Sequence, residues 1–222
     1  MTPGNGPRPV DLIIWDLDGT LAETAEDIAD SLNRTLAKRG LAPHSLQEVR
    51  EFIGGGIQNL IARAMEIDDP TDPRVTDEVM AFRGDYGANL VVKTALCPGA
   101  REAIEHFRGK AQVVISNKLQ DMTREIVSRL IPYGVMREVI GQGGDYPLKP
   151  DPASTNAMIA AHGTTAERTV FLGDSETDHD TARNAGCLSG LVTFGMRPRE
   201  EMLALDADFH MDDLRELKNF IC

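Results

Sequence analysis

The sequence is poor in the features that mark several large classes of protein. It has only three cysteines, Cys97, Cys187 and Cys222, which lie far apart and form no CxxC pair, so neither a disulfide framework nor a zinc site is predicted. No apolar run approaches the roughly 18 residues that a membrane helix needs. Residues 1–9 also lack the basic start and apolar stretch of a secretion signal. We therefore expect a soluble, cytoplasmic protein with no membrane partner.

Basic residues are scarce as well. Lysine and arginine together number 23 against 35 aspartates and glutamates, which gives a net charge of −12, and no basic stripe occurs. Nucleic-acid binding is therefore not expected. An anionic substrate remains compatible with this charge, because a bound divalent metal ion can reverse the sign of the field locally.

The chain has 222 residues, of which 41% are hydrophobic, and from about residue 99 strand and helix patterns alternate. A short apolar run over 10–15 predicts a first, buried strand. Further strands are predicted over 111–116, 139–141, 169–172 and 191–194, with an edge strand over 208–211. Helices are predicted over 100–107, 121–130, 152–162 and 177–185, with a last helix from Asp212. This alternation predicts an α/β fold with a doubly wound, mostly parallel sheet and a Rossmann-like core.

Helical patterns without strands fill the stretch between the first strand and this alternation. Thr24 is a plausible N-cap before one apolar stripe, and Ser45 with Glu48 forms a capping-box pattern before the next helix. Three glycines at 54–56 break the pattern, and two more helical stretches follow. The domain prediction is an α/β core over 10–21 and 94–222, a small helical cap over 22–93, and a mobile tail over 1–9.

Polar residues follow four of the predicted strands. They are Asp16 and Asp18, then the segment 116–118, then Lys149, then Asp174 with Asp178. Ligands bind outside the carboxyl ends of strands in open parallel sheets, so these side chains are expected to meet. Each motif alone has an ordinary interpretation as a helix cap or turn, but four together in this order are specific.

This set resembles the haloacid dehalogenase-like phosphatase superfamily. Asp16-Leu-Asp-Gly-Thr-Leu21 is similar to its DxDGT loop, Ser116 to its second motif, Lys149 to its third, and Gly173-Asp174 with Asp178 to its fourth. The helical insertion resembles the cap of the phosphoglycolate phosphatase group, as do residues 52–56 and 139–145. The resemblance implies Mg²⁺ bound by Asp16, the backbone carbonyl of Asp18, and Asp174, with Asp178 behind them. It also implies that Ser116 and Lys149 bind phosphoryl oxygens.

Physical chemistry assigns compatible roles to these residues. Asp16 can act as the nucleophile and form an aspartyl-phosphate. Asp18 can protonate the leaving oxygen and then take a proton from water. Thr20 and Asn117 are further predicted phosphate contacts, and Gly55 lies in a glycine turn whose backbone can approach a substrate closely.

The predicted function is a Mg²⁺-dependent phosphatase for a small phosphorylated metabolite, with 2-phosphoglycolate as the best candidate. Alternatives are phosphatases for sugar phosphates, pyrophosphate or N-acetylmuramate 6-phosphate, and a phosphosugar mutase. A non-enzymatic alternative is a signalling receiver domain that is phosphorylated on aspartate. That class is disfavoured because the DxD motif ends the first strand and a long helical insertion follows. The protein is expected to be a monomer or a homodimer.

Overall fold

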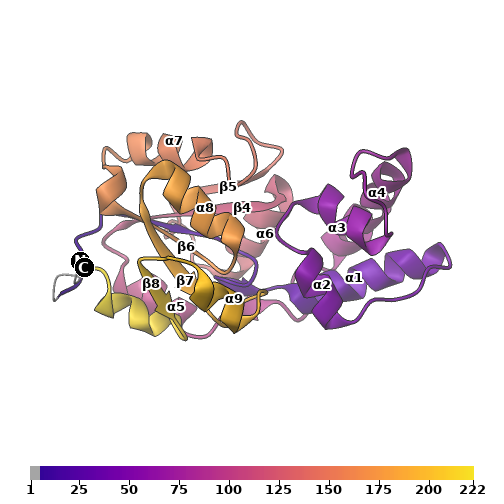
Figure 1. Cartoon of the computed structure of the whole chain (residues 1–222), viewed down its shortest axis with the longest axis horizontal. Coiled ribbons are helices and arrows are strands. Elements are labelled where there is room, and N and C mark those ends of the chain that lie inside the picture. Colours follow the sequence, from indigo (N-terminus) through magenta and orange to yellow (C-terminus); the bar gives the residue numbers. More distant parts are fainter. Residues whose placement is uncertain (1–5) are drawn as a thin grey trace.

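The computed structural model describes residues 6–222, which form two parts (Figure 1). One part is built on a parallel sheet, and the other is a group of helices inserted after the first strand. The predicted fold class, an α/β core with a helical insertion, is therefore confirmed. Across residues 6–222, no helix combines the length and the apolar character needed to cross a membrane.

Six strands form the core sheet in the order β5-β4-β1-β6-β7-β8, and every neighbouring pair is parallel. The central strand β1 (Leu12–Trp15) is fully buried, as expected where helices cover both faces of a sheet. The other strands are β4 (Ala111–Leu119), β5 (Glu138–Gln142), β6 (Thr169–Gly173), β7 (Leu188–Val192) and β8 (Phe209–Met211). The predicted edge strand near residue 208 is thus β8.

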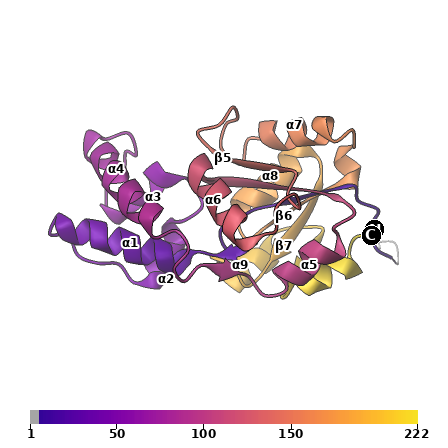
Figure 2. The same cartoon turned by 180° about the vertical axis from the view of Figure 1, so that it is seen from behind.

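Helices lie on both faces of this sheet. They are α5 (Ala100–His106), α6 (Gln120–Leu130), α7 (Ala153–Ala161) and α8 (Glu176–Ala185). Successive side chains of β1 point to opposite faces. Leu12 and Ile14 pack in the apolar cluster with α7 and α8, whereas Ile13 and Trp15 belong to the larger cluster that includes α5 and α6. Figures 1 and 2 show these two layers from opposite sides.

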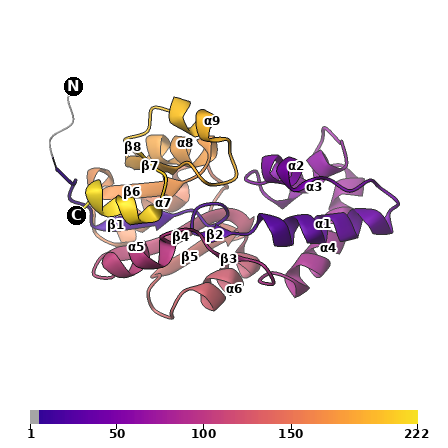
Figure 3. The same ribbon diagram turned by 90° about the horizontal axis from the view of Figure 1, so that it is seen from below.

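The insertion consists of α1 (Ala25–Lys38), α2 (Leu46–Phe52), α3 (Ile57–Ala64) and α4 (Pro73–Ala88). It leaves and re-enters the core through two short antiparallel strands, β2 (Ala22–Glu23) and β3 (Ala95–Leu96). Figure 3 shows the four helices beyond this pair. The Asp27 carboxylate accepts hydrogen bonds from the N–H groups of Val92, Lys93 and Thr94, so the start of α1 holds the returning chain.

Local sequence signals set helix ends in the insertion. The predicted capping box is present, because the Ser45 hydroxyl accepts from the Glu48 N–H and the Glu48 carboxylate accepts from the Ser45 N–H at 2.7 Å. Thr24 is the N-cap of α1 as predicted, but its side chain makes no capping hydrogen bond. It serves the candidate site described below.

Two predictions near the C-terminus are wrong in detail. The strand expected over 191–194 begins earlier, at Leu188, because Ser189 and Gly190 interrupt the apolar run that marked it. Gly190 is needed there, since a Cβ atom would overlap the side chains of Phe209 and Leu172. The last predicted helix is a 3₁₀ helix over Leu214–Asn219. Four elements were not predicted because they are too short for a periodic signal: β2, β3, α9 (Arg199–Ala204) and the 3₁₀ turn Ala166–Arg168.

The predicted tail over 1–9 falls partly outside the described residues, which begin at Gly6. Within the described part, Arg8 pairs with the end of the chain: its N–H donates to the Phe220 carbonyl at 2.8 Å, and its carbonyl accepts from the Cys222 N–H at 2.9 Å. The boundaries between core, cap and tail stay a prediction from the sequence.

Candidate active site

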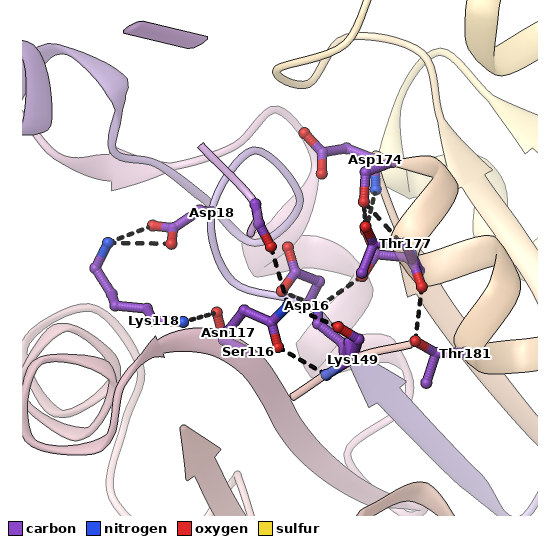
Figure 4. A network of polar contacts seen from close by, with 12 residues as sticks. Asp16, Asp18, Ser116, Asn117, Lys118, Lys149, Asp174, Thr177 and Thr181 are labelled. Atoms are coloured by element: carbon purple, nitrogen blue, oxygen red, sulfur yellow. Dashed lines mark hydrogen bonds and ion pairs between the residues drawn. The ribbon is translucent and has the colours of Figure 1, made fainter. Parts of the chain in front are cut away.

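A cavity lies where the carboxyl ends of the central strands face the inserted helices. This is the edge at which open parallel sheets bind ligands. The core contributes a polar wall and the insertion contributes an apolar one, so a bound molecule would meet charge on one side and hydrocarbon on the other. The polar wall includes Asp16, Asp18, Ser116, Asn117, Lys118, Lys149, Asp174 and Asp178, and the apolar wall includes Ile28, Ile57, Leu60, Phe82 and Tyr86. Figure 4 shows most of the polar side chains.

Lys149 lies at the centre of the polar wall, between two carboxylates. Its Nζ is 2.6 Å from Asp16 Oδ1 and 2.6 Å from Asp178 Oδ1. Asp16 directly follows β1, Lys149 lies between β5 and α7, and Asp178 is in the first turn of α8, so the sheet topology brings them together. All three side chains are buried, which limits screening of these ion pairs by solvent.

Asp174 completes a cluster of three buried carboxylates, with one oxygen of each within 4.8 Å of the others. Asp178 is fully engaged, because its Oδ2 accepts from the Ser175 hydroxyl at 2.6 Å and from the Asp174 N–H at 3.2 Å. Asp174 Oδ2 accepts from the Met196 N–H at 2.6 Å. Among the described residues, Asp16 Oδ2 and Asp174 Oδ1 have no hydrogen-bond partner.

Crowding of these buried groups changes their pKa values. Burial, opposed by the charge of Lys149, raises the pKa of Asp16 to about 7. Burial and the charges of Asp178 and Asp16 raise the pKa of Asp174 well above its ordinary value. Burial alone would lower the pKa of Lys149, but the charges of Asp16 and Asp178 outweigh it and raise that pKa, so the ammonium stays charged.

The donor set fits a divalent cation. If all three carboxylates are ionised, the single ammonium leaves two negative charges unbalanced in a buried cluster, and this is why the pKa values of Asp16 and Asp174 are raised when no cation is bound. Mg²⁺ prefers a few carboxylate oxygens and completes its shell with water and substrate oxygens. The oxygens without a protein partner belong to Asp16 and Asp174, the two carboxylates that the sequence resemblance assigns to the metal. Asp178 is held by Lys149 and Ser175, which fits the supporting position predicted for it.

Asp18 lines the same cavity but has a cation of its own. Lys118 Nζ lies 2.8 and 3.0 Å from the two Asp18 carboxylate oxygens, and the Thr24 hydroxyl donates to Asp18 Oδ1 at 2.5 Å (Figure 4 shows the Lys118 pair). This contact explains why Thr24 does not cap α1 with its side chain. The Lys118 side chain is only 6% exposed, and its Nζ lies 4.9 Å from the centre of the Tyr86 ring.

Ser116 and Asn117 lie near the end of β4, and both are buried. The Ser116 oxygen accepts from the Lys118 N–H at 3.3 Å, which leaves the hydroxyl proton available to a ligand. The Asn117 amide is used within the protein: its Oδ1 accepts from the Lys149 N–H at 2.8 Å, and its Nδ2 donates to the carbonyls of Lys149 and Gly54. Asn117 therefore fixes the Lys149 loop and ties it to the insertion.

Arg197 makes a second tie between core and insertion. Its Nη1 donates to the carbonyls of Arg50 and Glu51 at 3.1 Å each, and its Nη2 donates to the Ile53 carbonyl at 2.6 Å. These carbonyls lie at the C-terminal end of α2, where helical partners run out. Because the neighbouring Met196 N–H holds Asp174, one short segment contacts both the carboxylate cluster and the insertion.

Thr20 and Gly55 are the predicted site residues that do not line the cavity. The Thr20 side chain is buried with its hydroxyl unpaired. The Gly55 carbonyl accepts from Asn59 Nδ2 at 2.6 Å, whereas its neighbours Gly54 and Gly56 do line the cavity. The remaining predicted residues, Asp16, Asp18, Ser116, Asn117, Lys149, Asp174 and Asp178, are brought together there.

Sequence reasoning gave no role to three residues that the structure places in the cavity wall: Lys118, Tyr86 and Arg197. Lys118 had a signal, because it directly follows the second motif at a strand end. Tyr86 belongs to an apolar helical stripe that is typical of core packing. Arg197 stands in no pattern that indicates a role.

Comparison with known proteins agrees with this geometry. Residues 13–192 match the family model described as haloacid dehalogenase-like hydrolase. The chain is 34% identical over 211 residues to a phosphoglycolate phosphatase of Cereibacter sphaeroides, with 92% of this chain and 96% of the relative covered. A relative of the same name from Pseudomonas putida is 30% identical over 220 residues, with 97% of this chain and 80% of the relative covered.

A solved structure of a predicted phosphoglycolate phosphatase from Haemophilus somnus superposes with a TM-score of 0.84 at 27% identity, covering 94% of this chain and 96% of the other. The motif residues around one cavity, the insertion after β1 and these matches all agree. The chain belongs to the haloacid dehalogenase-like hydrolase family, and its relatives place it among the phosphatases of that family.

Proposed function

We propose that this phosphatase is Mg²⁺-dependent and hydrolyses 2-phosphoglycolate through an aspartyl-phosphate on Asp16. The observation that carries the proposal is the position of Asp16, which directly follows the central strand with one carboxylate oxygen bonded to Lys149 and the other without a protein partner. The name shared by relatives at 34% and 30% identity supports the choice of substrate.

Each step can be assigned to a side chain of the polar wall. One oxygen of the Asp16 carboxylate attacks phosphorus, the bond between phosphorus and the ester oxygen breaks, and Asp18 donates a proton to the departing alkoxide. Water then attacks the phosphorus of the aspartyl-phosphate and passes a proton to Asp18, which releases inorganic phosphate and restores Asp16. Ser116 and Lys149 hold the phosphoryl oxygens during both steps. Mg²⁺ held by Asp16, Asp174 and the Asp18 carbonyl would offset the charge on those oxygens.

The test is release of inorganic phosphate from a panel of phosphate esters, with Mg²⁺ and with a chelator in its place. We expect 2-phosphoglycolate to be preferred over sugar phosphates, pyrophosphate and N-acetylmuramate 6-phosphate, and the chelator to abolish release. Asp16→Asn should lower turnover by more than about a hundredfold, given the usual effect of removing a covalent nucleophile. A folded Asp16→Asn protein that keeps more activity would overturn the assignment of the nucleophile.

Asp11→Asn is a matched control in the same assay. Asp11 directly precedes β1, is about half exposed and pairs with Arg168 on the surface, so this change should leave turnover unaltered. The reaction products distinguish the hydrolase from a phosphosugar mutase. A mutase would return an isomeric phosphosugar without free phosphate. A preference for that outcome would overturn the hydrolase proposal.

A further inference from the structure

The cavity contains a cationic group that the phosphoryl chemistry does not use. Three positively charged side chains line it: Lys149, Arg197 and Lys118. Lys149 bonds Asp16 and Asp178 beside the nucleophile, and the Arg197 guanidinium is taken up by backbone carbonyls of the insertion. Lys118 bonds a single carboxylate, that of Asp18. An ammonium has three donors, and the two Asp18 contacts leave the third for a ligand or for the Tyr86 hydroxyl beside it.

A second polar atom, the Tyr86 hydroxyl, lies beside Lys118. The Tyr86 hydroxyl is buried and has no hydrogen-bond partner, although the residue is only 1% exposed and lines the cavity. Leaving a buried hydroxyl without a hydrogen bond is costly, so such a group favours a ligand that can accept from it. Burial raises the pKa of Tyr86 to about 12, so the hydroxyl keeps its proton and can donate it to an anion. The Lys118 ammonium lies over the ring of this tyrosine.

We propose that Lys118 and Tyr86 form a subsite for a second anionic group, a carboxylate, on the leaving group of the substrate. This inference rests on the proposed phosphatase function, because Asp18 is taken to reach the ester oxygen. Lys118 Nζ is 2.8 Å from the Asp18 carboxylate, so an anion that reaches Lys118 lies close to the ester oxygen. In a phosphorylated 2-hydroxy acid, one carbon separates that oxygen from the carboxylate, which is the short spacing this subsite selects.

The opposite wall adds to this selection. Ile28, Leu60 and Phe82 come from three helices of the insertion and offer no polar side-chain atom. Sugar hydroxyls placed against them would lose hydrogen bonds to water without replacement, which costs free energy. The cavity therefore favours a small acid over a sugar phosphate of the same charge.

The test compares two substrates that differ only at the subsite: 2-phosphoglycolate, and ethyl phosphate, in which a methyl group replaces the carboxylate. The measured quantity is kcat/KM for 2-phosphoglycolate divided by kcat/KM for ethyl phosphate. An effect of a substitution on Asp18 acts on both substrates and therefore cancels in this ratio. Lys118→Met should lower this ratio at least tenfold, mainly through KM for 2-phosphoglycolate. Tyr86→Phe should lower the ratio about threefold. Because this substitution removes only one hydroxyl group, it still tests the subsite if the Lys118→Met protein does not fold.

Lys93→Met is the matched control, because Lys93 lies at the end of the insertion, is 47% exposed and pairs with Glu26 and Asp30 on the surface. It should leave the ratio unchanged. An unchanged ratio in both Lys118→Met and Tyr86→Phe would overturn the subsite, even if both substrates react more slowly. Lys118 would then be a positioning residue for Asp18.

A binding measurement separates this inference from the proposed function. Calorimetric titration of the Asp16→Asn protein in Mg²⁺ with the same two esters needs no turnover. Tighter binding of 2-phosphoglycolate that disappears with Lys118→Met supports the subsite even if the wild-type protein hydrolyses neither ester. Equal affinities for the two esters refute the subsite even if hydrolysis occurs.

Discussion

The buried carboxylate cluster predicts that, in the absence of metal, the stability of Asp16→Asn relative to wild type depends on pH. The pKa of Asp16 is raised in the folded protein, from 3.8 to about 7, chiefly by burial. Folding therefore favours the protonated form, and this contribution to stability is fully present below pH 3.8 and is lost as the pH rises through about 7. Asparagine does not titrate, so the variant does not share this loss.

The size of the effect follows from the same values. The interval from 3.8 to about 7 is about 3 pH units, and at about 1.4 kcal/mol per unit the complete loss is about 4 kcal/mol. Between pH 5 and pH 7 the stability of Asp16→Asn relative to wild type should rise by about 2 kcal/mol, because Asp16 is half titrated at pH 7. For a chain of this size that corresponds to a Tm difference that grows by about 4–8 °C. Asp16→Asn also removes a charge that raises the pKa of Asp174, and this too increases the stability of the variant relative to wild type as the pH rises.

The assay is thermal unfolding of both proteins in chelator at pH 5, 6, 7 and 8, followed by circular dichroism. Acid effects common to both proteins cancel in the difference. Asp11→Asn is the control, because hydrogen bonding to Arg168 lowers the pKa of Asp11, so its contribution is lost only as the pH falls below about 4. Excess Mg²⁺ should shrink the rise for Asp16→Asn by offsetting the carboxylate charge. A Tm difference that is flat or falls between pH 5 and 7 would refute the reasoning.

Two further predictions concern Asp18 and the glycine turn. Asp18→Asn should lower turnover by about 10² to 10⁴, the usual effect of removing a general acid and base. In single-turnover phosphorylation, the rate with an aryl phosphate should fall less than the rate with an alkyl phosphate, because an aryl leaving group needs less protonation. Equal losses of rate for the two substrates would count against the role of Asp18 as the acid. Gly56→Ala should lower the free energy of unfolding by about 1–3 kcal/mol in urea denaturation, because Gly56 has φ 86° and ψ 169°, a region open essentially to glycine alone. Gly55→Ala should cost clearly less, since its φ is not positive, and equal costs for the two changes would contradict this account.

The parts of the fold that could be predicted are those with a repeating apolar signal or a specific cap. The central strand, the inserted helices and the Ser45 capping box all have such signals. The strand β7 was misplaced because what matters at Gly190 is the space left by Phe209 and Leu172, and that packing becomes visible only when the strands are paired. Elements of two or three residues, such as β2, are stabilised by pairing partners distant in sequence and carry no period of their own.

The residues of the candidate site also fall into those that the sequence predicts and those that only the tertiary structure reveals. Strand ends predicted Asp16 and Asp174, and the loop after a strand predicted Lys149, because the topology of a parallel sheet brings these positions together. Nothing in the local pattern distinguishes Thr24 as a helix cap from Thr24 as a donor to Asp18, since both uses suit a hydroxyl at that position. The partnership of Lys118 with Tyr86 depends on how α4 packs over the end of β4, which is a tertiary contact between residues far apart in the chain.

The antiparallel pair of β2 and β3 has a consequence for how this protein family can diversify. Ala22 lies opposite Leu96 and Glu23 opposite Ala95, so the two ends of a segment of about seventy residues are held side by side. A segment whose ends already meet can be lengthened, shortened or exchanged without changing the register of the six-stranded sheet. The residues that act on phosphorus would keep their places while the surface that faces the rest of the substrate is replaced. The same catalytic residues can thus be combined with insertions of different length and composition.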